Sequence, residues 1–196
     1  KNILEHHYAR STALQLFGLE VEKKTILIIG GSLGAGSINK VIEQNLASFR
    51  ENDIQLIWQT GQPNALHYAN AAQDFKNVYV CSFIDDMSAA YCAADIVVSR
   101  SGAMAVAEIC LTGKAALFVP YPHAAEDHQT FNAKVLVAEG AARMLHDSEV
   151  NEKLVPILMT LIHDENEIAQ MSKKVKALGL ENADQVIAQE IINYIQ

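Results

Sequence analysis

The stretch Thr25-Ile-Leu-Ile-Ile-Gly-Gly-Ser-Leu-Gly-Ala-Gly36 determines the expected fold class of this 196-residue chain. Its first five residues form a continuous, largely β-branched run, which is typical of a strand buried on both faces. Glycines follow at once, and residues 38–49 then carry apolar side chains at helical spacing. A strand, a glycine turn and a helix in this order form the first unit of an α/β fold.

The same alternation continues along the rest of the chain. Strands are predicted at residues 25–29, 54–58, 78–82, 95–99, 115–119 and 142–145. Helices are predicted at residues 4–17, 38–49, 64–72, 87–94, 103–111, 128–139, 152–163, 165–178 and 183–195. This pattern indicates an α/β, Rossmann-like parallel sheet of about six strands with helices on both faces. No linker or repeat divides the chain, so residues 1–196 are expected to form a single domain, with its ligand beyond the carboxyl ends of the strands.

The charge balance limits the classes of partner. The formal net charge is −8, and a nucleic-acid partner is not expected because it needs a basic face to neutralise its phosphates. A small phosphorylated ligand remains compatible, held by backbone amides and helix ends. No run approaches the ~20 apolar residues that a membrane span requires, so the domain is expected to be soluble.

The cysteines and histidines give no sign of a metal site or a disulfide. Cys81, Cys92 and Cys110 are odd in number, widely spaced and surrounded by apolar residues, so they are expected to be buried free thiols. The chain has no C-x-x-C motif and no histidines at ligand spacing with a nearby carboxylate. Neither a metal nor a cofactor is expected.

The glycine loop Gly30–Gly36 fits neither common nucleotide motif. A dinucleotide fingerprint that starts at Gly34 would need glycine where Asn39 stands. A P-loop that starts at Gly31 would need lysine where Ser37 stands. The loop still allows close backbone approach to a ligand, although the residues alone leave open a loop that makes only a tight turn.

A second candidate segment is Ser99–Glu108, where a strand end is followed by small residues and a helix start near Ala103. Open amides at a helix start suit a diphosphate. Glu108 lies about a turn and a half into the helix, where a carboxylate can accept hydrogen bonds from the two vicinal hydroxyls of a ribose. The alternative is a solvated helix glutamate.

Two further segments follow strands. In residues 120–132, Asp127 is a candidate N-cap, and His128, Gln129 and Asn132 offer donors and acceptors to sugar hydroxyls; ordinary capping with a polar first turn is the alternative. The adjacent carboxylates of residues 85 and 86 point apart, so we expect them to cap the helix that begins at Met87 rather than to hold a metal or act as a base.

These segments together resemble the C-terminal domain of the MurG family of bacterial N-acetylglucosaminyltransferases. The matching blocks, in order, are Gly-Gly-Ser-Leu-Gly-Ala (30–35), Phe-Ile-Asp-Asp-Met (83–87), Ser-Arg-Ser-Gly-Ala (99–103), Ala-Glu (107–108), Leu-Phe-Val-Pro-Tyr (117–121) and Asp-His-Gln-Thr-Phe-Asn-Ala (127–133). The resemblance runs from about Ala13 to the end of the chain, and its several spaced blocks make it more specific than any single glycine motif.

The resemblance implies one half of a GT-B fold: the C-terminal donor-binding domain, with the N-terminal acceptor domain absent from this sequence. The implied enzyme is an inverting, metal-independent hexosyltransferase of peptidoglycan synthesis, and hence of cell wall biogenesis, cell shape and cell division. It moves N-acetylglucosamine from UDP-N-acetylglucosamine to lipid-linked N-acetylmuramoyl-pentapeptide, converting lipid I to lipid II. The implied location is peripheral, on the cytoplasmic side of the bacterial inner membrane.

The resemblance also implies roles for particular residues. Gly31 and Ser32 would contact the donor, and the backbone of Ile84 would read the uracil edge with Phe83 close to the ring. Glu108 would hold the ribose hydroxyls, and His128 with Gln129 would face the sugar. The diphosphate would be lined by Ala103, Met104, Ala105, Val106 and Ala107. No catalytic residue is implied in this chain, because the general base belongs to the missing domain.

Two other functions stay open at this point. Another GT-B enzyme of UDP-sugars, such as a UDP-N-acetylglucosamine 2-epimerase, would share the glycine loop and the ribose carboxylate. A non-enzymatic nucleotide-sugar-binding module would share them too. In either case the phosphates would be held by amides and helix ends.

Overall fold

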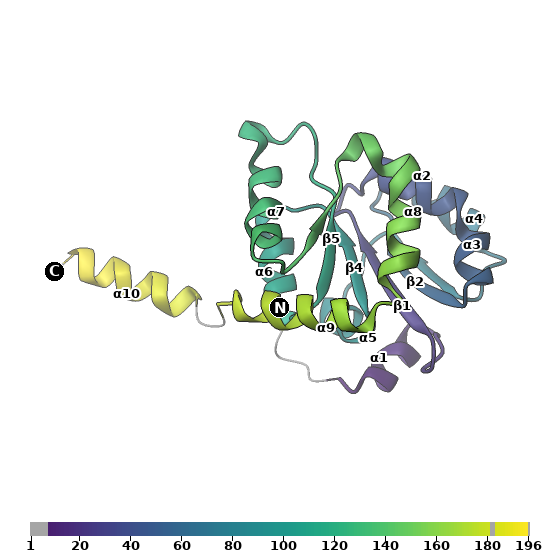
Figure 1. The fold of residues 1–196 in the computed structure, drawn as a ribbon, viewed down its shortest axis with the longest axis horizontal. Coiled ribbons are helices and arrows are strands. Elements are labelled where there is room, and N and C mark those ends of the chain that lie inside the picture. Colours follow the sequence, from purple (N-terminus) through teal and green to yellow (C-terminus); the bar gives the residue numbers. More distant parts are fainter. Residues whose placement is uncertain (1–7, 181–182, 196) are drawn as a thin grey trace.

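Six parallel strands form one sheet at the centre of the computed structural model, which describes residues 8–180 and 183–195 (Figure 1). The strands are β1 (Lys24–Ile29), β2 (Ile54–Gln59), β3 (Val78–Cys81), β4 (Ile96–Ser99), β5 (Ala115–Phe118) and β6 (Arg143–Met144). Their order across the sheet is β3-β2-β1-β4-β5-β6. Every strand pairs in parallel with its neighbours, which confirms the Rossmann-like sheet.

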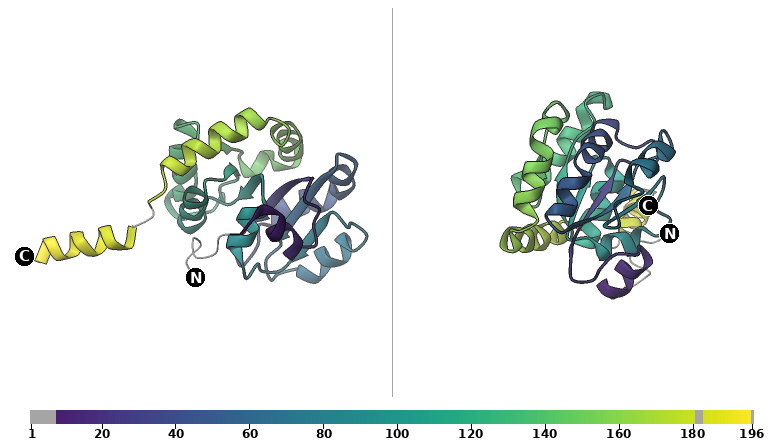
Figure 2. Two further views of the ribbon diagram at one scale, coloured as in Figure 1. Left: turned by 90° about the horizontal axis from the view of Figure 1, so that it is seen from below. Right: turned by 90° about the vertical axis from the view of Figure 1, so that its right-hand side faces the viewer.

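Helices cover both faces of this sheet (Figure 2). One core contains side chains of α2 (Gly36–Gln44), α3 (Leu46–Glu51), α4 (Ala65–Ala72) and α8 (Val150–Leu161). The other contains side chains of α1 (Arg10–Leu16), α5 (Met87–Ala93), α6 (Ala103–Thr112) and α7 (His128–Ala138). Helix α9 (Glu165–Ala177) contributes to both, and α10 (Ala183–Ile195) extends away from the body (Figure 1).

The central strand explains why residues 25–29 are apolar without alternation. Ile26 and Ile28 belong to one core, and Leu27 and Ile29 belong to the other. Because helices cover both faces of a parallel sheet, a central strand has no solvent face. The strand therefore fixes the position of the glycine loop that follows it.

Two predicted helices differ from the structure. The single helix predicted at 38–49 is two helices, α2 and α3, which meet at Asn45. The Asn45 side chain donates a hydrogen bond to the Val41 carbonyl at 2.8 Å, and such local bonding competes with a regular helix. Of the helix predicted at 4–17, residues 4–7 lie outside the described residues. The described helix α1 begins at Arg10, and the φ of 66° at Gly18 is typical of a glycine that follows the C-terminus of a helix.

The cysteine prediction is correct for pairing and partly wrong for burial. All three thiols are free, but only Cys110 is buried, whereas Cys81 and Cys92 are half-buried. Burial raises the pKa of Cys81 to about 11. Within residues 8–180 and 183–195, no helix combines the length and the apolar character needed to cross a membrane.

Candidate functional site

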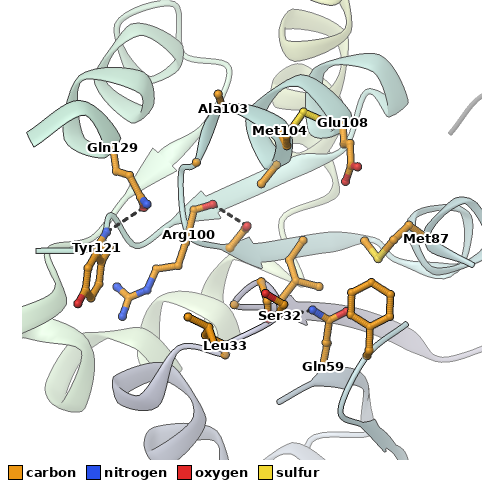
Figure 3. Close-up of a pocket in the computed structure, with 18 residues that line it drawn as sticks. Ser32, Leu33, Gln59, Met87, Arg100, Ala103, Met104, Glu108, Tyr121 and Gln129 are labelled. Carbon is orange, nitrogen blue, oxygen red and sulfur yellow. Dashed lines mark hydrogen bonds between the residues drawn. The ribbon is translucent and has the colours of Figure 1, made fainter. Parts of the chain in front are cut away.

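The site lies where the chain order reverses in the sheet. From β1 the chain proceeds to β2 and β3 on one side, and then returns to β4, β5 and β6 on the other. At such a switch point the loops that leave the strand ends diverge and create a crevice. A pocket of about 770 Å³ occupies this position (Figure 3), lined by Ile29, Gly30, Gly31, Ser32, Leu33, Gly34, Gln59, Phe83, Met87, Ser99, Arg100, Gly102, Ala103, Met104, Ala105, Glu108, Tyr121 and Gln129.

The glycine loop packs directly against the end of β2. Gly34 has a φ of 74°, and a Cβ there would lie 2.0 Å from the Thr60 carbonyl oxygen. Asn39 takes the place of the third fingerprint glycine, and its amide donates to the Thr60 carbonyl at 2.8 Å. Trp58 donates its indole N–H to the Asn39 side chain at 2.9 Å. These bonds attach the start of α2 to β2 and hold the loop at the edge of the pocket.

Helix α6 presents unpaired amides to the pocket. Its first backbone bond is donated by Val106 to the Gly102 carbonyl at 3.0 Å. No hydrogen-bond partner among the described residues engages the amides of Ala103, Met104 and Ala105, and no side chain caps the helix. All three residues line the pocket. A helix start of this kind is an anion-binding site through its N–H groups and its dipole.

Glu108 brings a carboxylate to the same pocket from the next part of α6. Figure 3 shows this side chain pointing from the helix toward the pocket. Its Oε2 accepts a hydrogen bond from the Tyr91 hydroxyl at 3.0 Å. Tyr91 belongs to α5 and is 1% exposed. Burial and the nearby Glu108 carboxylate raise the pKa of Tyr91, so the phenol remains a donor at neutral pH.

Gln59 is a pocket residue that the sequence did not single out. It ends β2, lies almost fully buried and lines the pocket. Its Oε1 accepts from the Ile84 backbone N–H at 3.0 Å, and its Nε2 donates to the Gly31 carbonyl at 3.2 Å. One side chain thus joins the glycine loop to the β3–α5 loop. Ile84 itself is buried and does not line the pocket, whereas its neighbour Phe83 does.

Arg100 is the second residue that the sequence did not single out. Its guanidinium donates to the carbonyls of Val119 and Pro120 at 3.1 and 3.0 Å, and to Ser37 Oγ at 3.0 Å. It also pairs with Asp147 at 2.6 Å. The group is therefore engaged on several sides, and it lies 5.6 Å from the ring centroid of Tyr121.

The first turn of α7 places Gln129 in the pocket but not His128. Gln129 Oε1 accepts from the Tyr121 backbone N–H at 3.0 Å. The His128 side chain is exposed, with Nδ1 2.8 Å from the Ala125 carbonyl. Asn132 donates to the Ser101 carbonyl at 3.0 Å and thereby ties α7 to the turn before α6.

The two capping predictions have opposite outcomes. Asp86 caps α5, because its side chain accepts from the Ala89 N–H at 3.0 Å. The prediction for Asp127 is wrong: the residue stands at the N-cap position of α7 but its side chain makes no capping bond. Its φ of 52°, next to 51° at Glu126, puts two successive residues in the left-handed region, outside the extended backbone that an N-cap normally adopts.

The structure brings most of the candidate residues together. Those that line the pocket are Gly31, Ser32, Phe83, Ala103, Met104, Ala105, Glu108 and Gln129, and those that do not are Ile84, Val106, Ala107 and His128. The pocket also contains Leu33, Gln59, Met87, Arg100 and Tyr121, which the sequence did not assign. All but Gln59 lie inside the candidate segments named in the sequence analysis. Their place in a segment that follows a strand was the feature of the sequence that could have identified them as pocket residues. The part of the chain that the structure describes contains no cluster of three or more His, Cys, Asp or Glu residues able to hold a metal.

Known proteins are similar to this chain in sequence and in fold. The chain is 43% identical, over 98% of its length, to the UDP-N-acetylglucosamine–N-acetylmuramyl-(pentapeptide) pyrophosphoryl-undecaprenol N-acetylglucosamine transferase of Bacteroides thetaiotaomicron, of which it covers 53%. The protein of the same name from Flavobacterium psychrophilum is 40% identical over 95% of the chain, which covers 51% of it. The chain therefore spans about half the length of the curated relatives that it matches.

Solved structures agree with this relationship. MurG of Acinetobacter baumannii matches with a TM-score of 0.77 and 32% identity, over 88% of this chain and 52% of that one. The UDP-GlcNAc 2-epimerase of Neisseria meningitidis matches with a TM-score of 0.60 at 16% identity, over 94% of this chain and 48% of that one; at that identity the likeness extends to the fold alone. The resemblance to the MurG family is confirmed, and the sheet is one half of a GT-B arrangement. The model of the "Glycosyltransferase family 28 C-terminal domain" matches residues 25–190, and the chain belongs to that family.

Proposed function

We propose that this chain is the donor-binding domain of an inverting N-acetylglucosaminyltransferase. Its donor is UDP-N-acetylglucosamine, and the acceptor is lipid-linked N-acetylmuramoyl-pentapeptide held by a separate N-terminal domain. The proposal draws on the transferase name carried by relatives at about 40% identity and on the chemistry of the pocket. Residues 1–196 act in it as a single domain.

The observation that carries this proposal is the arrangement of α6 in the pocket. Three unpaired amides at the helix start and a carboxylate a turn and a half later lie along one wall. Amides and a positive helix dipole suit a diphosphate, and a carboxylate suits a pair of vicinal hydroxyls. A nucleoside diphosphate presents both groups, in this order, along its length.

The other subsites follow from this placement. Phe83 lies beside the uracil ring. The Ile84 N–H already donates to Gln59 Oε1, which leaves the Ile84 carbonyl for the uracil edge. Ser32 of the glycine loop and Gln129 face the diphosphate and the sugar. His128 reaches the sugar only after its side chain turns away from the Ala125 carbonyl that it now faces.

The chemical contribution of this domain is to stabilise the leaving group. Negative charge develops on the departing UDP as the bond to the sugar breaks. The amides at the start of α6 are fixed in place beforehand, so they stabilise that charge without reorganisation. The general base that activates the acceptor hydroxyl belongs to the other domain, and this chain alone binds donor without significant turnover.

The biological setting follows from the acceptor. The names of the relatives specify a pyrophosphoryl-undecaprenol acceptor, which is a membrane lipid. The proposed enzyme therefore works as a peripheral protein at a membrane, and we assign it to the cytoplasmic face of the bacterial inner membrane. Its product supports peptidoglycan synthesis and, through it, cell shape and cell division.

The alternatives have less support. The epimerase shares the fold at 16% identity, whereas the relatives at about 40% identity are named as transferases. A non-enzymatic binding module would share the pocket, but the names of the relatives give no support to that function. The pocket fits all three functions, and the names of the relatives at about 40% identity favour the transferase.

Calorimetry with UDP and UDP-N-acetylglucosamine tests the proposal. We expect the chain to bind both, and Glu108→Ala to weaken binding about 10- to 100-fold, the range for losing hydrogen bonds to a charged group. Glu139→Ala removes an exposed glutamate of the C-terminal end of α7 and is the matched control. Unchanged affinity in Glu108→Ala would remove Glu108 from the site, and no binding of either ligand by the wild type would refute the proposal.

A further inference from the structure

The Glu108 carboxylate accepts a hydrogen bond from a buried residue of a different helix. The Tyr91 hydroxyl, on α5, donates to Glu108 Oε2 at 3.0 Å. Tyr91 is among the largest fully buried side chains, packed in the core between α5 and the sheet. Its ring cannot move without disturbing that core, because interiors of this kind are close-packed.

The pairing is specific in both directions. Within the described residues, Glu108 is the hydrogen-bond partner that the structure gives the Tyr91 hydroxyl. A buried hydroxyl without a partner is unfavourable, so the phenol and the carboxylate are matched. The bond engages Oε2 and leaves Oε1 with its acceptor capacity for a ligand.

We propose that Tyr91 is a positioning residue that fixes the Glu108 carboxylate for recognition of the ribose 2′- and 3′-hydroxyls. The inference rests on the proposed function, because it assumes that Glu108 meets the ribose. A free glutamate side chain rotates about several bonds and loses that freedom when a ligand binds. Because Tyr91 already restricts the Glu108 side chain, less conformational entropy is lost when a ligand binds. The same bond directs one carboxylate oxygen toward the pocket.

Sugar selectivity follows from this arrangement. A fixed carboxylate distinguishes a ribose from a 2′-deoxyribose, since the deoxy sugar offers Oε1 one hydroxyl donor instead of two. A mobile carboxylate adapts to either sugar. Tyr91 thus increases the preference for ribonucleotides without contacting the ligand.

The test is the ratio of affinities for UDP and 2′-deoxy-UDP, measured by calorimetry on the 196-residue chain. We expect the wild type to prefer UDP by about 10-fold or more, and Tyr91→Phe to reduce that preference to about threefold. Tyr68→Phe is the matched control: Tyr68 is another buried tyrosine, but it packs against Trp58 in the other core. It should keep the wild-type ratio.

The outcomes separate this inference from the proposed function. If Tyr91→Phe keeps the wild-type ratio while Glu108→Ala abolishes it, the positioning role is refuted and the ribose assignment stands. If the wild type binds neither nucleotide, the proposed function fails and the inference fails with it. Should Tyr91→Phe not fold, Glu108→Asp retains the charge but shortens its reach to Tyr91; a ratio at the wild-type level would then overturn the inference.

Discussion

At the scale of single residues, two glutamines of β2 perform the same task at opposite ends of one strand. Gln59 joins the Gly31 carbonyl to the Ile84 N–H at the pocket end. Gln55 joins the backbone of Glu20 to Thr25 at the other end. Both are buried, and both satisfy backbone groups that the sheet leaves unpaired. Only Gln59 connects two loops of the pocket.

This symmetry provides a controlled prediction. Gln59→Leu and Gln55→Leu should each lower the free energy of unfolding, by about 1–3 kcal/mol, because each removes the hydrogen-bond partner of buried or partly buried backbone groups. Only Gln59→Leu should also weaken UDP binding, since the glycine loop and the Phe83 loop lose their connection. Urea unfolding and calorimetry on both variants measure the two effects. Equal loss of affinity in the two variants would show that Gln59 acts through stability alone.

At the scale of elements, Arg100 connects loops that follow four different strands. It lies after β4, and its partners are Ser37 after β1, Val119 and Pro120 after β5, and Asp147 after β6. The Arg100 and Asp147 side chains are only 13% and 21% exposed, so the loss of one charge leaves the other poorly solvated. The pair therefore holds together the carboxyl edge of the sheet.

Removal of the charge from Asp147 should loosen that edge. We expect Asp147→Asn to lower the free energy of unfolding by about 1–3 kcal/mol, a value reduced for the partial exposure of the pair. Affinity for UDP should fall as well, because Tyr121 and the glycine loop adjoin this cluster. Glu165→Gln removes a carboxylate that pairs with Lys24 at the surface and should leave unfolding in urea unchanged. A neutral result for Asp147→Asn would show that the cluster does not stabilise the edge.

Elements were predictable from the sequence where the cause was local. The first five strands follow from largely apolar runs bounded by turns, and α6 begins at Ala103 as its small residues indicated. The break at Asn45 and the left-handed pair at Glu126 and Asp127 were missed, because side-chain bonding and backbone strain leave no periodic signal. Arg100 and Gln59 were missed for another reason: their partners are distant in sequence and meet only in the folded chain.

At the scale of the whole molecule, the charge distribution is unusual for the diphosphate site that we propose. The chain has a formal net charge of −8. Arg100 is the only cation among the described residues that line the pocket, and Asp147 neutralises it. In the proposed complex, the amides of α6 hold the phosphates and act at contact distance. The long-range field of the protein opposes the ligand, whereas the local contacts attract it.

This separation predicts an inverted salt dependence. Between about 0.05 M and about 0.5 M NaCl the Debye length falls from roughly 14 Å to roughly 4 Å, which screens the long-range repulsion but not the amide contacts. Affinity for UDP should therefore stay constant or rise up to about threefold. Leu33→Lys places a cation on the exposed part of the pocket wall, so that variant should bind UDP more tightly at low salt and weaken as salt increases. Calorimetry in NaCl and in potassium glutamate of equal ionic strength separates screening from competition by chloride. A wild-type affinity that drops steeply in both salts would mean that free cations, not amides, hold the diphosphate.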